Sequence, residues 1–268
     1  MTLRCEPCFT ELAESFKSFA GGRRIVEIVN TGNWGDALIH AGQAQFLRDI
    51  GVTPWRIPVQ KLHKIRGKKL WALSTILTRR AFVTGNGVFT PWYERPEQIS
   101  EIARYFSGVF LMPSSYKIFP EFDPSQTTVW RRDNLESYEN APMSRFCHDF
   151  AFYLEPRPKP PKKKIGFLFR NDREAAPFPV PEANRDISSE GTHASDPGRF
   201  FDEVGQYEVV VTNRLHVGIA ASLIGRTVHL FDNRSKKIQS VYQSSIKPFY
   251  DNVHYHAEPP TEALLRQL

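Results

Sequence analysis

An arginine and a histidine stand two positions apart, at 214 and 216, and a run of three valines at residues 209–211 precedes them by two residues. The valines predict a buried strand, and the apolar spacing from Leu215 to Ile224 predicts a helix that ends at Gly225. Arg214 and His216 then lie where the helix begins, and unpaired backbone N–H groups and the helix dipole attract anions there. The pattern indicates a phosphate or carboxylate ligand. An arginine bonded to a neighbouring loop and a surface histidine would fit the same spacing.

The rest of the chain alternates between predicted strands and predicted helices. Most of the strands end in glycine, polar or charged residues, and open parallel sheets place their ligands at that edge. The alternation predicts an α/β protein. A stretch from 175 to 198 has no periodicity and is predicted to be a loop. The predicted strands cover residues 24–29, 80–84, 108–112, 127–130, 146–147, 165–169, 209–212 and 227–231.

A stretch rich in proline and lysine divides the chain. Four prolines between 156 and 161 exclude a helix interior and a central strand, so residues 156–164 are predicted to be a stiff linker. It separates an N-terminal domain, 1–155, from a C-terminal domain, 165–268. We expect two Rossmann-like βα domains whose strand ends face each other across a cleft.

Composition narrows the class of protein. The 268 residues include 35 basic and 29 acidic side chains, a balance of +6 that suits a phosphorylated substrate and is too weak to indicate nucleic acid. No apolar run approaches the roughly 20 residues of a membrane span, and the first residues lack a signal-peptide pattern. We therefore expect a cytoplasmic protein. The lysines of the linker could contact anionic lipid at the inner face of the plasma membrane, or form a solvated charge run.

The three cysteines do not predict a metal site. Cys5 and Cys8 form an isolated Cys-x-x-Cys pair, and only Cys147 is added elsewhere. Structural zinc normally takes four ligands, so free thiols are the expectation.

Several segments, taken in order and at their spacing, resemble the polysaccharide pyruvyl transferase family, from about Asn30 to Tyr242. A single segment of this kind would carry little weight, whereas their order is specific. The chain departs from the family pattern at Asn86, which replaces the middle residue of a three-glycine loop, and at Asn213, which replaces an acid. The second domain is also short. The matching segments are 33–39, 85–87, 111–115, 131–138, 148–151, 170–174, 212–216 and 230–237.

The resemblance implies transfer of the enolpyruvyl unit of phosphoenolpyruvate onto two hydroxyls of one sugar in an exopolysaccharide or its precursor. The product is a cyclic pyruvate ketal, and phosphate is released. The implied fold is similar to the two-domain GT-B glycosyltransferases. Phosphoenolpyruvate is a co-substrate, so no cofactor is expected. The acceptor sugar would be either free or lipid-linked.

The residue types suit that chemistry. Arginine can grip a phosphate or carboxylate in two places, so Arg170 and Arg214 are expected to hold the donor, with Lys237 as a further contact. His216 is expected to be the general acid that protonates the methylene carbon. Asp36 and Asp149 are expected to hydrogen-bond or deprotonate the sugar hydroxyls. We also expect substrate contacts from Leu215, Asn33 and Asn86, and no metal ligands.

Each assignment has a structural alternative. Asp36 would also serve as a helix N-cap and Asp149 as a buried cap. Arg170 would form an ion pair with Asp172 or Glu174. At the level of function, a nucleotide-sugar glycosyltransferase of GT-B type would have the same architecture and anion site. A non-catalytic carbohydrate-binding homologue is the third interpretation.

Overall fold

The structure is a computed structural model that describes residues 3–76, 78–87, 89–91, 94–172, 174–175, 178, 180–233 and 236–267. Contacts divide the chain into two compact units. The six-strand unit comprises Thr2–Thr31 and Gly42–Tyr153, and the four-strand unit comprises Gly32–Ala41 and Leu154–Leu268. The segment 32–41, which the sequence analysis assigned to the N-terminal domain, therefore packs with the C-terminal residues.

The six-strand unit is built on a wholly parallel sheet of order β2-β1-β3-β4-β5-β6. Its strands are β1 (Val26–Val29), β2 (Trp55–Pro58), β3 (Arg80–Val83), β4 (Gly108–Ser114), β5 (Thr127–Arg131) and β6 (Arg145–Phe146). The helical segments are η1 (Leu3–Cys5), α1 (Pro7–Ala20), α3 (Val59–Lys64), α4 (Lys68–Ile76), α5 (Arg95–Ala103), α6 (Glu136–Asn140) and η2 (Phe150–Tyr153). Helix α2 (Asp36–Asp49) is shared, because its residues up to Ala41 belong to the four-strand unit and the rest to the six-strand unit.

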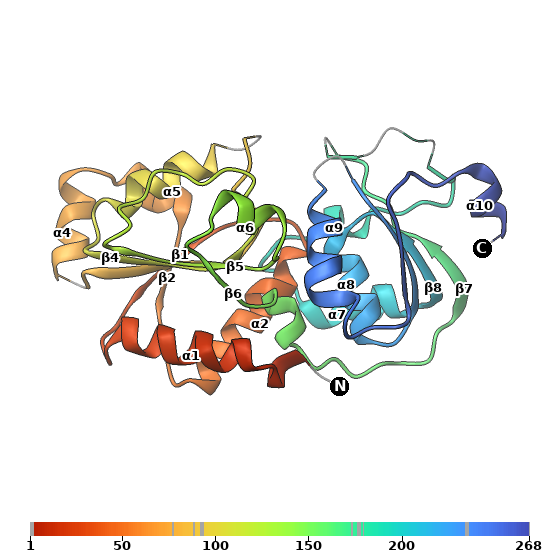
Figure 1. The fold of residues 1–268 in the computed structure, drawn as a ribbon, viewed down its shortest axis with the longest axis horizontal. Helices are drawn as coiled ribbons and strands as arrows, with labels where there is room; N and C mark the ends of the chain where they lie inside the picture. The colour runs from red at the N-terminus through yellow and green to blue at the C-terminus, as the bar shows by residue number, and fades with distance from the viewer. Residues whose placement is uncertain are drawn as a thin grey trace. The chain divides into compact units, whose positions relative to one another are not determined.

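Helices cover both faces of this sheet, with α1 on one side and α4 and α5 on the other (Figure 1). Side chains alternate between the faces along each strand. Phe82 therefore faces α1, where the ring of Phe16 lies edge-on against Phe82 and Phe110, each centroid 5.1 Å away. Ala81 and Val83 join the core on the opposite face. Burial on both faces explains the continuous apolar strands of the sequence.

The four-strand unit contains a second parallel sheet, of order β10-β9-β8-β7. Its strands are β7 (Lys163–Phe167), β8 (Tyr207–Thr212), β9 (Thr227–Phe231) and β10 (Val253–His256). The helical segments are η3 (Ile187–Glu190), α7 (Pro197–Gly205), α8 (Leu215–Leu223), α9 (Lys237–Val241), η4 (Tyr242–Ile246) and α10 (Glu262–Gln267). The mixed α/β class with parallel sheets is therefore confirmed.

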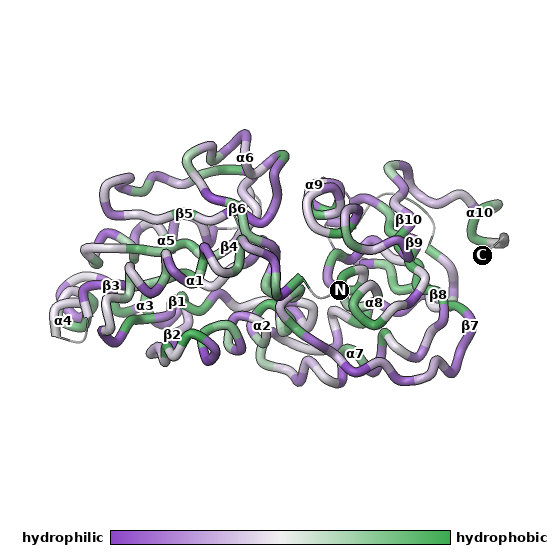
Figure 2. Tube along the Cα trace, turned by 60° about the horizontal axis from the view of Figure 1, so that its bottom comes forward, coloured by the Kyte–Doolittle hydropathy of each residue, from purple (hydrophilic) through white to green (hydrophobic). Residues whose placement is uncertain are grey.

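One face of the second sheet carries a core of Phe169, Val211 and Phe231, against which Leu264 and Leu265 of α10 pack. Helix α8 covers the other face, and its apolar sequence appears as a largely green coil in Figure 2. It packs closely, because a Cβ at Gly218 would come within 2.9 Å of Leu230. The lysine-rich segment before β7 is mostly purple and exposed. The predicted strand and helix between 209 and 225 are confirmed.

Among the described residues, two strands were not predicted, and both are edge strands: β2 and β10. The stretch 175–198 was predicted to be a loop. Its described residues include the short helical segment η3 and the start of α7. Arg173, Arg234 and Ser235, which belong to the matching segments, lie outside the described residues. No helix in the described part of the chain is long and apolar enough to cross a membrane.

Candidate functional site

The carboxyl ends of β7 and β8 lie side by side, because Phe167 pairs with Val211 in parallel register. After this pair, the segments that follow β7 and β8 remain connected through side-chain hydrogen bonds. Asn213 Oδ1 accepts a hydrogen bond from the Arg170 N–H (2.8 Å), and the Thr212 hydroxyl donates to the Leu168 carbonyl (2.6 Å). The amide of Asn213 thus fixes the backbone from which the Arg170 side chain extends.

Arg170 holds two carboxylates. Its Nε and Nη2 donate to the two oxygens of Asp172 at 2.8 and 2.9 Å, and its Nη1 donates to Glu174 at 2.7 Å. Lys237 Nζ donates to the same Glu174 oxygen at 2.7 Å. Burial alone would lower the pKa of Arg170, but the hydrogen bond to Asp172 and the charge of Glu174 outweigh it and raise that pKa. The alternative of an ion pair for Arg170 is therefore the geometry observed.

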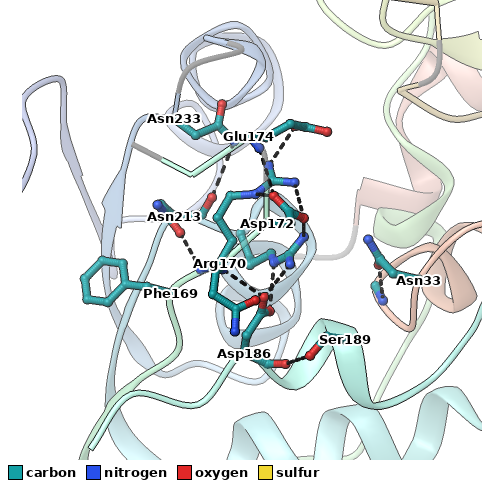
Figure 3. A network of polar contacts seen from close by, with 12 residues as sticks. Asn33, Phe169, Arg170, Asp172, Glu174, Asp186, Ser189, Asn213 and Asn233 are labelled. Carbon is teal, nitrogen blue, oxygen red and sulfur yellow. Dashed lines mark hydrogen bonds and ion pairs between the residues drawn. The ribbon is translucent and has the colours of Figure 1, made fainter. Parts of the chain in front are cut away.

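Arg214 is held in the same way. Its Nε and Nη2 donate to the two oxygens of Asp186 at 2.9 and 2.5 Å, and its Nη1 lies 3.0 Å from Asp172. Asp172 therefore bridges the two arginines. Burial would raise the pKa of Asp172, yet the hydrogen bond and charge of Arg170, with the charge of Arg214, lower it overall. Figure 3 shows this cluster around the labelled Arg170, Asp172 and Asp186.

The cluster compensates its own charge. Among the residues that the structure describes, it joins three cationic and three carboxylate side chains: Arg170, Arg214, Lys237, Asp172, Glu174 and Asp186. Arg170 and Arg214 are only 5% and 7% exposed, whereas Asp172 is 39% exposed. The carboxylate of Asp172 therefore occupies the solvent-facing position between the guanidinium groups. That is the position at which an anionic ligand would meet both arginines.

A second segment of this unit is the turn that leads into α2. Asn33 Oδ1 accepts from the Gly35 N–H (2.8 Å), while Asp36 Oδ2 accepts from the Asn33 N–H (2.9 Å). This reciprocal pair closes the turn before α2 and resembles a capping box. The arrangement requires glycine at 32, because a Cβ there would lie 1.9 Å from Asp36 Oδ2. In Figure 3 no dashed line joins Asn33 to the arginine cluster.

The other oxygen of Asp36 faces the histidine. Asp36 Oδ1 lies 4.0 Å from His216 Nδ1, an electrostatic contact longer than a hydrogen bond. His216 is the second residue of α8, with Arg214 at the N-cap position and Leu215 buried between them. The backbone of Gly35 lies against the imidazole, because a Cβ there would come within 3.0 Å of His216 Cβ and 3.2 Å of Nδ1.

Residues 188–200 hold this turn in the four-strand unit. The Trp34 N–H donates to the Ser188 carbonyl (3.0 Å), and its indole Nε1 donates to the Asp196 carbonyl (3.0 Å). The His193 N–H donates to the Gly32 carbonyl (3.1 Å). The Trp34 ring meets Phe200 edge-on at 5.5 Å. These contacts bring Asp36 to His216 from the opposite half of the sequence.

Asn86 and Asp149 belong to the six-strand unit. Asp149 forms a fully buried ion pair with Arg132 (2.5 Å), and its other oxygen accepts from the Ala151 N–H at the start of η2. Arg132 Nε donates to the Ser115 hydroxyl, and the Ser115 N–H donates to the Asn86 carbonyl. Asn86 and Asp149 are thus joined through Arg132 and Ser115 at the carboxyl edge of the sheet.

The structure therefore groups the predicted residues in two sets. Asn33, Asp36, Arg170, Arg214, Leu215, His216 and Lys237 belong to the four-strand unit, and Asn86 and Asp149 to the other. Sequence reasoning missed Asp186 and Arg132. Asp186 lies in a stretch without periodicity, so nothing in the sequence marks it as the partner of Arg214. Arg132 follows strand β5, and that position was its only signal. No described group of three or more His, Cys, Asp or Glu side chains could hold a metal ion.

Comparison with known proteins supports the fold. No family model matches the chain, and no curated protein matches it. A crystal structure of a functionally uncharacterized protein from Klebsiella pneumoniae subsp. pneumoniae is similar, with a TM-score of 0.75 and 23% sequence identity. The match covers 94% of this chain and 99% of the other. At this identity the likeness concerns the fold alone.

Proposed function

We propose that the protein transfers the enolpyruvyl unit of phosphoenolpyruvate to two hydroxyls of one sugar and releases phosphate, as a polysaccharide pyruvyl transferase. The observation that carries the proposal is the pair formed by Asp36 and His216, whose side chains lie 4.0 Å apart; His216 is at the start of α8, two residues after Arg214. It combines an acid–base group with cationic side chains in one unit, as addition to an anionic enol phosphate requires.

The reaction forms two C–O bonds at the same carbon, the first by addition and the second by substitution. The first sugar hydroxyl attacks C2 of phosphoenolpyruvate, the C=C π bond breaks, and the methylene carbon takes up a proton; the hydroxyl proton passes to solvent, from which the proton donor is protonated again. The second hydroxyl then attacks C2 and expels phosphate, which carries away the second hydroxyl proton. His216 supplies the proton to the methylene carbon. Asp36 Oδ1 faces Nδ1 of that ring and orients it. Asp36 then acts through His216 rather than on the sugar hydroxyls.

The donor anion would be held by Arg170, Arg214 and Lys237. A guanidinium contains five N–H donors, of which Arg170 uses three and Arg214 two in hydrogen bonds to the described carboxylates. The donor carboxylate or phosphate would replace Asp172, the exposed carboxylate between the arginines. Asp186 and Glu174 stay in place because both are buried.

The proposal extends to a GT-B-like architecture, in which the six-strand unit supplies the acceptor side with Asp149 and Asn86. The acceptor would be a sugar of an exopolysaccharide or its precursor. The exposed lysines before β7 suit a protein that works in the cytoplasm at the inner face of the membrane, where lipid-linked acceptors are found.

The compensated charge of the cluster favours a second candidate, a carbohydrate-binding homologue without turnover. One assay separates the candidates: the protein is incubated with a panel of sugars and either phosphoenolpyruvate or nucleotide sugars, and released phosphate and nucleotide are measured. We expect acceptor-dependent phosphate release from phosphoenolpyruvate, and a sugar product that mass spectrometry shows to carry one carboxyethylidene group. Nucleotide release would indicate a glycosyltransferase instead. Release of neither, with retained sugar binding, would support the binding homologue.

A further inference from the structure

Two of the three thiols lie together in the six-strand unit, and they are not the two that stand close in sequence. Cys8 is the second residue of the 14-residue helix α1, whereas Cys147 directly follows β6. The thiol of Cys147 donates a hydrogen bond to the sulfur of Cys8. Cys5, three residues before Cys8, is exposed and takes no part in this contact.

Contacts between the residues next to the two cysteines hold the thiols close together. Phe9, next to Cys8, lies with its ring 6.1 Å from the ring of His148, next to Cys147. The side chain and the backbone N–H of His148 both donate hydrogen bonds to the Cys8 sulfur. Cys147 is completely buried, whereas Cys8 is partly exposed. A small reagent can therefore reach Cys8, whereas Cys147 is covered and interacts with Cys8.

The donors around Cys8 also favour its thiolate. The hydrogen bond from Cys147 has the largest effect, and those from His148 add to it, so the pKa of Cys8 falls to about 5 although burial opposes this. The first turn of a helix adds further stabilisation of negative charge. Burial and the neighbouring Cys8 raise the pKa of Cys147. At neutral pH the partly exposed Cys8 is the nucleophile, and the buried Cys147 keeps its proton.

We propose that Cys8 and Cys147 form an oxidation site for hydroperoxides, with Cys8 as the attacking thiolate and Cys147 as the resolving thiol. The Cys8 sulfur attacks the terminal oxygen of the hydroperoxide, the O–O bond breaks, and an alcohol or water leaves with a proton from solvent. The resulting sulfenic acid at Cys8 is then attacked by the Cys147 sulfur. The S–O bond breaks, water leaves with the Cys147 proton, and a disulfide forms. Two thiols have then been oxidised by one hydroperoxide.

The test treats the full-length protein with hydrogen peroxide and maps its peptides without reduction. We expect one intramolecular disulfide between Cys8 and Cys147 in the wild type and in Cys5→Ser, the matched control that removes the exposed neighbour. Cys147→Ser should instead accumulate a dimedone adduct at Cys8, and Cys8→Ser should form no disulfide. A Cys5–Cys8 disulfide, or a Cys8 that resists peroxide while Cys5 is oxidised, would overturn the proposal.

A second measurement does not depend on a buried substitution. The folded wild-type protein is alkylated with iodoacetamide at pH 6, and the rates at Cys5 and Cys8 are compared by mass spectrometry. Cys8 should react at least about tenfold faster than Cys5, because reactivity follows the thiolate fraction. Equal rates, or faster reaction of Cys5, would also overturn the proposal.

Discussion

Asp36 Oδ1 and His216 Nδ1 lie 4.0 Å apart in the four-strand unit, although the two residues come from opposite halves of the sequence. Asp36 reaches this position because its other oxygen closes the turn with Asn33. One carboxylate thus combines a structural task with an electrostatic one. This explains why the alternatives for Asp36 that the sequence left open, cap or functional residue, do not exclude each other.

Replacing Asp36 by Asn tests this double role. The amide oxygen can still accept from the Asn33 N–H, so folding should be retained and the thermal midpoint should change little. The charge that faces His216 is lost, so we expect kcat to fall about tenfold or more, with the KM for phosphoenolpyruvate within a few-fold of the wild type. Asp36→Ala, which also removes the cap, should in addition cost about 1 kcal/mol of stability. Unchanged kcat in Asp36→Asn would show that the carboxylate does not act on His216.

The two carboxylates that contact Arg214 should have different roles. Replacing Asp172 by Asn should change the affinity for the donor, whereas replacing Asp186 by Asn should change the stability of the fold. Asp172 is partly exposed, and its replacement by Asn removes the charge that competes with a donor anion for the two arginines. We expect the dissociation constant for phosphoenolpyruvate to fall about tenfold, since hydrogen bonds to charged groups contribute about 1.5–3 kcal/mol. Calorimetric titration measures this, and weaker donor binding would contradict the displacement of Asp172.

Asp186→Asn is the matched control. This carboxylate is buried, and it also accepts from the Asn171 N–H at 3.0 Å. Removing its charge leaves the buried Arg214 short of a partner, so the free energy of unfolding should decrease by about 3–5 kcal/mol. Urea unfolding followed by circular dichroism measures the change. A loss of the same size in Asp172→Asn would mean that both acids have the same structural task.

Acid should destabilise the four-strand unit through His229. Burial, followed by the charges of His256 and His254, lowers the pKa of His229 from 6.5 to about 4, and its Nδ1 lies 3.1 Å from His256 Nε2. Between these two pH values the unfolded chain binds the proton more tightly than the folded one. Stability from this histidine is therefore complete above pH 6.5 and is lost as the pH falls towards 4. Thermal melts across this range should show a shallower decline for His229→Gln, and an identical decline would exclude His229 as a cause.

The strands that are buried on both faces, and the helices with a continuous apolar face, could be predicted from the sequence. The segment from 209 to 225 is an example, because its valines and helical spacing leave one interpretation, and Gly225 has the positive φ of 70° that ends a helix. Strands β2 and β10 lie at sheet edges and are only partly buried. Their sequences, with a proline and with two histidines, lack the apolar run that marks a central strand.

Within the site, strand ends and the helix start placed Arg170, Arg214 and His216 on the correct elements. Their partners depend on contacts between distant segments, which no local pattern encodes. Asp186 meets Arg214 from a stretch without periodicity, and the turn around Asp36 is held by residues 188–200. The self-compensated charge of the cluster was therefore visible only in three dimensions.

The central claim is that His216 donates a proton during turnover of phosphoenolpyruvate. It is tested most directly by comparing the wild type with His216→Gln, once an acceptor sugar is known, for donor affinity by calorimetry and for phosphate release at saturating donor. We predict donor binding within a few-fold of the wild type and a turnover rate lower by a factor of roughly 10²–10⁴, the usual contribution of a general acid. Normal turnover at saturation, with donor affinity lost, would contradict the account and make His216 a binding residue.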